Sequence, residues 1–216
     1  MKVRTWMTKD PVTIGPNETL EVAEGKMHRG RFRRLLVVDE RGQLLGIITS
    51  RDLAEHHGYL PVTRVDAAIV ERPITIGPDA PIEAAAALLL QHKIGGLPVV
   101  ASNGQLLGII TETDLLRGLL QGLSGGEAVS GRIDFQFTDP EQTFAGAVAL
   151  IEAAGGTILG LGTLRAEDEG GTRTFYLRVL GRDIEALAEA LRRNGYAVGA
   201  VHAATATWAT CGAPRG

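Results

Sequence analysis

The sequence predicts an α+β protein made of a duplicated β-α-β-β-α unit and a separate β-α-β-β-α-β unit. The first observation is that the stretch from Gly46 to Leu53 returns as Gly108 to Leu115. In both, an apolar β-branched run ends at a threonine and an aspartate follows three residues later. The second observation is that a glycine-rich run from Gln121 to Gly126 separates this repeat from a different pattern of elements.

The repeat can be followed from Pro11 at a constant offset of 62 residues, so that Pro11 matches Pro73. Each copy begins with a short extended segment closed by Gly-Pro, at 12–14 and 74–76. Apolar residues at spacings of three and four then predict a helix. These residues are Leu20, Ala23 and Met27 in the first copy and Ile82, Ala86 and Leu89 in the second.

Two strands follow in each copy, at 35–38 and 44–48 in the first, with a short polar hairpin turn between them. The repeated stretch then starts a second helix. Residues 59–68 are interpreted as a linker between the copies. One copy alone is not expected to cover its apolar strands, whereas two copies packed together cover them.

The C-terminal part is expected to have its own fold. Strands are predicted at 132–137, 157–164, 172–180 and 197–201, and helices at 143–154 and 183–193. Glycines follow both helices, and the polar run from Glu167 to Gly171 fits a hairpin loop. This order is that of a ferredoxin-like layer, in which one sheet carries two helices on one face. Residues 204–216 are expected to form a flexible tail.

Composition excludes several classes of function. The formal net charge of −3 provides no general attraction to nucleic acid. The single cysteine, Cys211, allows no intramolecular disulfide and suits a reducing compartment. No apolar run approaches the roughly 18 residues of a membrane span, and the N-terminus lacks the apolar core of a signal peptide. We therefore expect a cytoplasmic protein that binds neither nucleic acid nor membrane.

The sequence offers no catalytic residue, metal ligand set or enzymatic cofactor motif. None of the five histidines lies in an H-E-x-x-H arrangement, and no cysteines stand at metal spacing. Neither a G-x-S-x-G elbow nor a phosphate-binding G-x-x-x-x-G-K-[ST] loop is found. An enzyme would need a catalytic group that the sequence does not supply.

Two features suggest ligand binding. Thr49 with Asp52, and Thr111 with Asp114, place a hydroxyl and a carboxylate at the start of a helix, where they either bind a ligand or only cap the helix. The residues alone leave these alternatives open. The second feature is a basic cluster, present in the first copy only: Arg29, Arg31, Arg33 and Arg34, matched in the second copy by Gln91, Lys93, Gly95 and Gly96. Charge found in one copy is not required for folding, and Arg33 and Arg34 favour an anion such as phosphate.

These residues resemble a tandem pair of cystathionine-β-synthase (CBS) domains. The resemblance rests on Met7-Thr8-x-x-Pro11-Val12-Thr13, on Leu97-Pro98-Val99-Val100 and on both Gly-Ile-Ile-Thr-x-x-Asp segments. It implies a pseudo-two-fold module of domains at 7–58 and 69–121, followed by a linker at 122–131. It also implies clefts for adenosine-containing ligands such as AMP, ADP, ATP or S-adenosylmethionine.

The resemblance further implies that each cleft mixes the two copies. One set of residues, here called the Asp114 group, is Thr13, Ile14, Arg33, Arg34, Thr111 and Asp114. The other, the Asp52 group, is Thr75, Ile76, Gly95, Gly96, Thr49 and Asp52. In both, the aspartate is expected to bind ribose hydroxyls. Because the arginine pair falls in the Asp114 group, we expect that cleft to prefer phosphorylated nucleotides.

Residues 132–203 resemble an ACT domain, an amino-acid-sensing module, with Thr138-Asp139-Pro140 in the loop after the first strand. The combination resembles bacterial acetoin-utilisation-type regulatory proteins. It implies a homodimeric, non-catalytic sensor of adenine nucleotide, with an amino acid as a candidate second ligand. The alternative is a scaffold protein in which the repeats are structural and no nucleotide binds.

Overall fold

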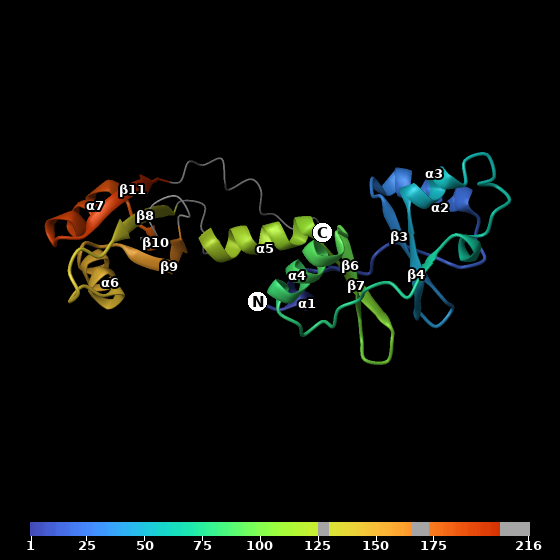
Figure 1. Cartoon of the computed structure of the whole chain (residues 1–216), viewed down its shortest axis with the longest axis horizontal. Coiled ribbons are helices and arrows are strands. Elements are labelled where there is room, and N and C mark those ends of the chain that lie inside the picture. Colours follow the sequence, from blue (N-terminus) through green and yellow to red (C-terminus); the bar gives the residue numbers. More distant parts are fainter. Residues whose placement is uncertain (125–129, 166–172, 204–216) are drawn as a thin grey trace. The chain divides into compact units, whose positions relative to one another are not determined.

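The computed structural model describes residues 1–124, 130–165 and 173–203. The chain forms two compact units, Met1–Gly118 and Leu119–Gly216 (Figure 1). The predicted tail at 204–216, the whole of the predicted hairpin loop at 167–171 and the middle of the predicted linker lie outside the described residues.

The first unit contains the two copies of the repeat. The first copy consists of β2 (Thr13–Ile14), α2 (Leu20–Gly30), β3 (Arg34–Val38), β4 (Leu44–Thr49) and α3 (Ser50–Glu55). The second consists of α4 (Ile82–His92), β6 (Gly96–Val100), β7 (Leu106–Thr111) and α5 (Glu112–Ser124). The order matches the prediction with one exception. The expected strand at 74–76 is reduced to a parallel bridge between Ile76 and Val99.

Each copy packs one helix face onto its strands. The buried residues of α2 are Leu20, Ala23 and Met27, as predicted. In α4 they are Ile82, Ala85 and Leu89, so the prediction of Ala86 is wrong. Ala85 follows Ile82 by three residues and precedes Leu89 by four, which repeats the spacing of α2 and places all three on one face.

The segments that lead into the two copies are exchanged between them. In the leader of the first copy, α1 (Val3–Trp6) precedes β1 (Thr8–Lys9), and β1 pairs with β7 of the second copy. The leader of the second copy contains a 3-10 turn (Val65–Ala67) and β5 (Val70–Glu71), which pairs with β4 of the first. The residues interpreted as a linker therefore pack on the first copy, and the boundaries predicted at 7–58 and 69–121 cut across this exchange.

Equivalent backbone bonds hold both leaders. The N–H of Val3 donates to the carbonyl of Ala80 at 2.9 Å, and the N–H of Val65 donates to the carbonyl of Glu18 at 2.9 Å. The β-hairpin turns also meet, because Leu106 N–H donates to the carbonyl of Gly42 at 3.0 Å. The two copies therefore fold together as one unit and are not two independent domains.

The second unit has the predicted order of elements. These are β8 (Gly131–Gln136), α6 (Phe144–Ala153), β9 (Thr157–Arg165), β10 (Arg173–Leu180), α7 (Ile184–Arg193) and β11 (Ala197–His202). The four strands form one antiparallel sheet in the order β11-β8-β10-β9. Its core includes Phe135, Ile151, Leu177 and Leu191, all without exposed surface.

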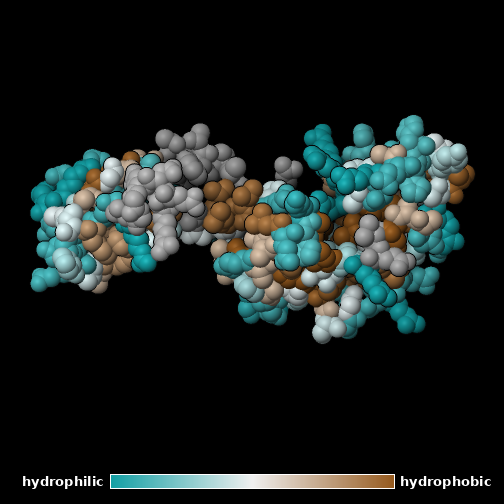
Figure 2. Space-filling model, in the orientation of Figure 1, coloured by the Kyte–Doolittle hydropathy of each residue, from teal (hydrophilic) through white to brown (hydrophobic). Residues whose placement is uncertain are grey.

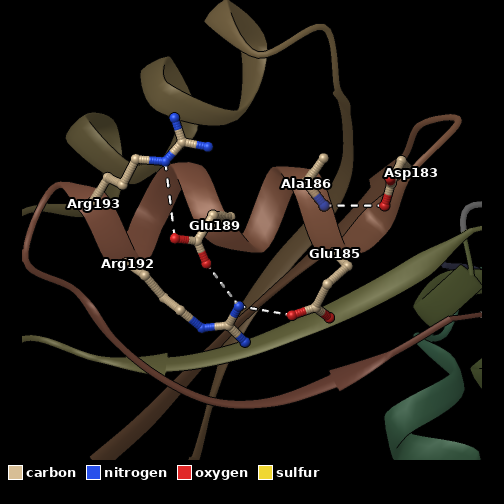
Figure 3. Close-up of polar contacts among 6 residues, drawn as sticks. All are labelled: Asp183, Glu185, Ala186, Glu189, Arg192 and Arg193. Carbon is tan, nitrogen blue, oxygen red and sulfur yellow. Dashed lines mark hydrogen bonds and ion pairs between the residues drawn. The ribbon is translucent and has the colours of Figure 1, made fainter.

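Helix α7 shows how the helices of this unit are held locally. The carboxylate of Asp183 accepts the N–H of Ala186 at 3.0 Å and so caps the first turn (Figure 3). The Nη1 atom of Arg192 lies 2.7 Å from Glu185 and 3.1 Å from Glu189 (Figure 3). These ion pairs are largely exposed, so the buried side of α7 contributes more to stability than they do.

Helix α5 continues beyond the expected domain boundary. The run from Gln121 was predicted to be flexible, yet the helix extends to Ser124. Leucines at spacings of three and four carry the helical pattern through Gly118 and Gly122. Leu116 and Leu119 are 60% and 51% exposed, and hydrophobic surface lies over α5 in Figure 2. Within residues 1–124, 130–165 and 173–203, no helix is long and apolar enough to cross a bilayer.

Candidate functional site

The first motif, Thr49 to Asp52, joins β4 to α3. The Asp52 Oδ2 atom accepts two hydrogen bonds from Thr49, from its N–H at 2.7 Å and from its hydroxyl at 2.8 Å. The Oδ1 atom of Asp52 has no hydrogen bond or ion pair with any described residue, and the side chain is partly exposed. Asp52 therefore caps its own helix with one oxygen and keeps the other available.

The second motif, Thr111 to Asp114, repeats the cap but closes it further. Asp114 Oδ2 accepts the N–H of Thr111 at 2.9 Å and its hydroxyl at 2.6 Å. The Asp114 N–H donates back to the Thr111 hydroxyl at 3.4 Å. The Nη1 atom of Arg117 then donates to Asp114 Oδ1 at 3.2 Å, and Asp114 is only 5% exposed. Both carboxylate oxygens of Asp114 are engaged.

The capping alternative is thus realised in both copies. It does not exclude ligand binding at Asp52, because a carboxylate oxygen outside the cap can still accept hydrogen bonds. At Asp114 the same oxygen already faces a guanidinium. Glu55 stands where the second copy has Arg117, so this ion pair has no counterpart in the first copy.

The two predicted arginines lie beside the first motif. Arg34 is directly opposite Thr49 in the β3–β4 pairing. The carbonyl of Arg33 accepts the N–H of Ser50 at 2.9 Å. The backbone of both arginines is thus next to the threonine and serine of their own copy, and this pairing does not decide to which group their side chains belong.

The side chain of Arg34 reaches into the second copy, over two glycines. A Cβ atom on Gly95 would lie 2.6 Å from Arg34 Nη2, and one on Gly96 would lie 2.9 Å from Nη1. Any larger residue at Gly95 would displace the guanidinium. Gly96 is opposite Thr111 in the β6–β7 pairing, and a Cβ atom on Gly96 would also lie 3.4 Å from Thr111 Cγ2, so the Arg34 guanidinium lies beside the threonine of the Asp114 group.

Charged residues of both copies also act on the Arg34 guanidinium. Burial is the largest effect and lowers the pKa of its guanidinium, the charge of Glu112 raises it, and the charge of Arg33 lowers it. The group remains protonated at neutral pH, because an arginine does not lose its proton in proteins. Glu112 begins α5, and Ser50 takes its place in the first copy.

The remaining predicted residues are partly built into the cores. Ile14 and Ile76 are 1% and 7% exposed, so their side chains pack inward. Thr13 and Thr75 are partly exposed. Among the described residues, no hydrogen bond or ion pair joins these four residues to the aspartate of the group assigned to them.

Sequence reasoning missed three residues that distinguish the motifs: Arg51, Glu112 and Arg117. Arg51 is exposed and has no hydrogen bond or ion pair with any described residue. The signal was available, because the first motif reads Thr-Ser-Arg-Asp and the second Thr-Glu-Thr-Asp.

Two surface hollows lie close to these residues without including them. One, of about 360 Å³, is formed between α2 and α3 and is lined by Met27, His28, Phe32, Ser50, Leu53 and His57, among others. The other, of about 380 Å³, is lined by Arg4, Met7, Lys9, Asp10, Pro78 and Leu107. None of the twelve predicted residues lines either hollow. The described residues contain no group of three or more histidine, cysteine or acidic side chains suited to a metal ion.

Comparison with known sequences identifies the repeat. The model of the CBS domain matches residues 3–59 and 65–121. A CBS domain-containing protein of Dictyostelium discoideum is 36% identical over 134 residues, which are 56% of this chain and 92% of that protein. Inosine-5'-monophosphate dehydrogenase of Mycobacterium tuberculosis is 38% identical over 112 residues, but these are 51% of this chain and only 21% of the enzyme.

Solved structures are similar over a little more than half of the chain. CBSX2 in complex with AMP matches 56% of this chain and 96% of its own, with 25% identity and a TM-score of 0.51. The CBS pair of protein MJ0100 in complex with 5'-methylthioadenosine and S-adenosylmethionine matches 55% and 95%, with 28% identity and a TM-score of 0.51. A protein of Vibrio cholerae described as an acetoin utilization protein matches 56% and 91%, with 32% identity and a TM-score of 0.52.

Proposed function

The chain belongs to the CBS-domain family, and we propose that it is a non-catalytic regulatory sensor that binds an adenosine-containing nucleotide through its CBS pair. One observation carries the proposal. Asp52 holds a carboxylate oxygen free of described partners, beside arginines, in the part of the chain that is similar to AMP-bound CBSX2 and to the S-adenosylmethionine-bound pair of MJ0100.

The chemistry of the motif suits a nucleoside. A ribose carries two neighbouring hydroxyl donors, and a carboxylate accepts both. The Thr49 hydroxyl and the arginines add contacts suited to ribose and to phosphate oxygens. We propose the residues of both groups as ligand contacts: Thr13, Ile14, Arg33, Arg34, Thr111 and Asp114, with Thr49, Asp52, Thr75, Ile76, Gly95 and Gly96.

We also propose that the second unit is an ACT-like domain and that the protein works as a cytoplasmic homodimer. The β-α-β-β-α-β order and the β11-β8-β10-β9 sheet support the first part, because this is the arrangement of a ferredoxin-like layer. The exposed leucines of α5 support pairing of two copies. An amino acid is the candidate ligand of this unit, and acetoin utilisation is the candidate process.

Regulation follows only if the nucleotide binds one arrangement of the protein more tightly than another. The exchanged leaders provide a physical route. Each leader packs on the other copy, so a ligand that changes the spacing of the copies also moves α1 and β5. The chain itself then transmits occupancy and performs no reaction.

The second candidate is a scaffold protein in which the motifs only cap helices. The complete capping at Thr111 and Asp114, with both carboxylate oxygens engaged, favours it for the second copy. This alternative does not explain the Asp52 Oδ1 atom and the neighbouring Arg51 side chain, neither of which has a hydrogen bond or ion pair with any described residue.

Thermal unfolding with and without ligand separates the two candidates. A nucleotide at 100 times its dissociation constant stabilises the folded state by about 2.7 kcal/mol. For a protein of this size we expect the melting temperature to rise by about 5–10 °C. AMP, ADP, ATP and S-adenosylmethionine are the ligands, with guanosine monophosphate as the control. Absence of any shift with all four overturns the sensor proposal and leaves the scaffold.

A further inference from the structure

We infer that the sheet of the second unit, on the face opposite its two helices, is a docking surface for an acidic segment of a partner protein. The residues involved all lie in the second unit, Leu119–Gly216, and outside the part of the chain that the CBS domain model matches. The docking surface and the nucleotide site proposed for the first unit can therefore be tested separately.

The sheet of the second unit has one apolar face and one polar face. The apolar face packs in one core with residues of α6 and α7 and includes Ile133, Phe135, Leu177 and Val179. Because side chains alternate along a strand, the residues between these lie on the other face, here called the open face. It carries Arg132, Asp134 and Gln136 of β8 and Thr174, Tyr176 and Arg178 of β10. All six are partly exposed.

Two arginines lie side by side on the open face, and only one of them has an acidic partner. Arg132 and Arg178 are directly opposite each other in the β8–β10 pairing, so their side chains are neighbours. Arg132 donates to Asp134 from Nε at 2.6 Å and from Nη2 at 2.9 Å. The Nε atom of Arg178 donates to the Ser130 hydroxyl at 3.0 Å, but its guanidinium has no ion pair with any described residue. Arg178 therefore carries a positive charge that the described part of the chain does not neutralise.

The surroundings of Arg178 are unfavourable for a charge without an acidic partner. Burial is the largest effect and lowers the pKa of its guanidinium, the charge of Arg132 lowers it further, and Tyr176 raises it. The arginine stays protonated at neutral pH, so burial and repulsion both destabilise the charged side chain in the folded protein. A carboxylate placed against Arg178 relieves both effects. The two Nη atoms, which the Ser130 bond does not use, offer such a carboxylate two parallel hydrogen bonds.

The basic side chains form a row across the sheet. His202 of β11 is opposite Arg132, and Arg132 is opposite Arg178 of β10. Gly160 of β9 continues the row without a side chain. Neighbouring strands are about 4.8 Å apart, so the three basic residues span about 10 Å. Neither of the surface hollows described above includes a residue of this unit. Because a small molecule is usually held in a concave pocket, the row is better suited to an extended segment of a larger partner.

The chemistry of the open face favours a protein segment over nucleic acid and over a second copy of the same face. Single-stranded nucleic acid is held by aromatic rings that stack on its bases. The one aromatic ring among the six residues, that of Tyr176, lies over Gly162 and has the Arg132 guanidinium 4.8 Å from its centroid. If two open faces met, the only acid among the six residues would be Asp134, which is already bonded twice to Arg132. The partner that complements Arg178 is therefore a segment rich in glutamate or aspartate.

The test uses the full chain and a fluorescent octapeptide of alternating glutamate and serine as the probe. Arg178→Gln is expected to weaken binding about 10- to 100-fold, the effect of losing a charge-assisted hydrogen bond. Arg173→Gln is the matched control, because Arg173 is exposed on the same strand but alternates onto the other face. It should change the affinity less than about twofold, since it removes only an exposed charge. Fluorescence anisotropy measures all three proteins.

Several outcomes overturn the inference. These are equal binding by wild type and Arg178→Gln, an equal loss in Arg173→Gln, and no binding of the peptide to wild type at millimolar concentration. Tighter binding of a short oligouridine that also depends on Arg178 would assign the face to nucleic acid instead. Urea unfolding without peptide tests a merely structural role. Arg178→Gln should be at least as stable as wild type, because it removes the repulsion from Arg132, and a clear fall in the urea midpoint would overturn the inference. Loss of AMP binding bears on the proposed function alone.

Discussion

The two copies of the repeat are alike where they are buried and different where they are polar. Leu35 and Leu97, at matched positions, are 1% and 0% exposed, and Val37 and Val99 are both fully buried. Around the motifs the matched residues instead differ in charge, as with Arg51 against Thr113. The comparison teaches that the duplication kept the packing of the core in both copies, while the charges around the motifs differ between them.

A second contrast lies in how each copy is completed. β1 closes the sheet of the second copy and β5 closes that of the first, so each copy needs a segment that precedes the other. The cores can be compared position by position, but neither copy is a separable domain. A change in one core should therefore lower the stability of the whole first unit.

The largest expected effect tests the equality of the cores. Leu35→Ala and Leu97→Ala each remove a fully buried side chain and should each cost about 2–5 kcal/mol in unfolding free energy. Urea unfolding followed by circular dichroism measures both. The two costs should agree within about 1 kcal/mol and should affect one shared transition. If either substitution left the unfolding free energy unchanged, or produced a separate transition at lower urea concentration, the two cores would not be equivalent.

The next effect in size tests the inequality of the motifs. Asp114→Ala removes the partner of Arg117 and leaves the N–H of Thr111 without its acceptor, and we expect it to cost about 1–3 kcal/mol. Asp52→Ala removes only an accessible cap and should cost about 0.5–1.5 kcal/mol. Chemical denaturation in the absence of nucleotide gives both values. A larger loss at Asp52 would mean that its carboxylate is structural and would weaken its assignment to a ligand.

Periodicity in the sequence was sufficient for the order of elements and for most of the buried faces. The helix from Leu20 and the strand before Val38 follow directly from apolar spacing, because burial on one face imposes it. Ala86 was chosen wrongly over Ala85 within a run of alanines, where hydrophobicity does not distinguish neighbours. The end of α5 was missed because glycine was given more weight than the leucine pattern around it.

The pairing of strands that are far apart in the sequence could not be predicted from periodicity. The exchange of leaders depends on which strand edge is free once the two copies have packed together. The two-residue sequences of β1 and β5 do not indicate which strand each will pair with. The same limit explains the arginines. Their place before β3 is visible in the sequence, but only the register of β3 with β4 shows that Arg34 lies opposite Thr49.

The smallest expected effect concerns a charge that the first copy has and the second lacks. The Glu18 carboxylate accepts the N–H of Gly15 at 2.9 Å and the ammonium group of Lys26 at 3.2 Å. At the matched positions the second copy has Ala80 and Leu88. Burial acts most strongly on Glu18 and raises its pKa, but the Gly15 N–H and Lys26 together outweigh it, so the net pKa is lowered.

A lowered pKa in the folded state gives a contribution that is present above the unfolded glutamate value, about 4.3, and is lost as pH falls through the folded value. Glu18→Gln should therefore lower stability at neutral pH by only a few tenths of a kcal/mol, because the pair is partly exposed and screened by solvent. The difference from wild type should shrink below about pH 4. Urea midpoints measured from pH 7 to pH 3 check this, and Ala80→Gln, at the matched position, is the control that should show no such trend. A Glu18→Gln variant that is more stable than wild type at neutral pH, with a gain that disappears on acidification, would mean that burial dominates at Glu18 and that its charge destabilises the first copy.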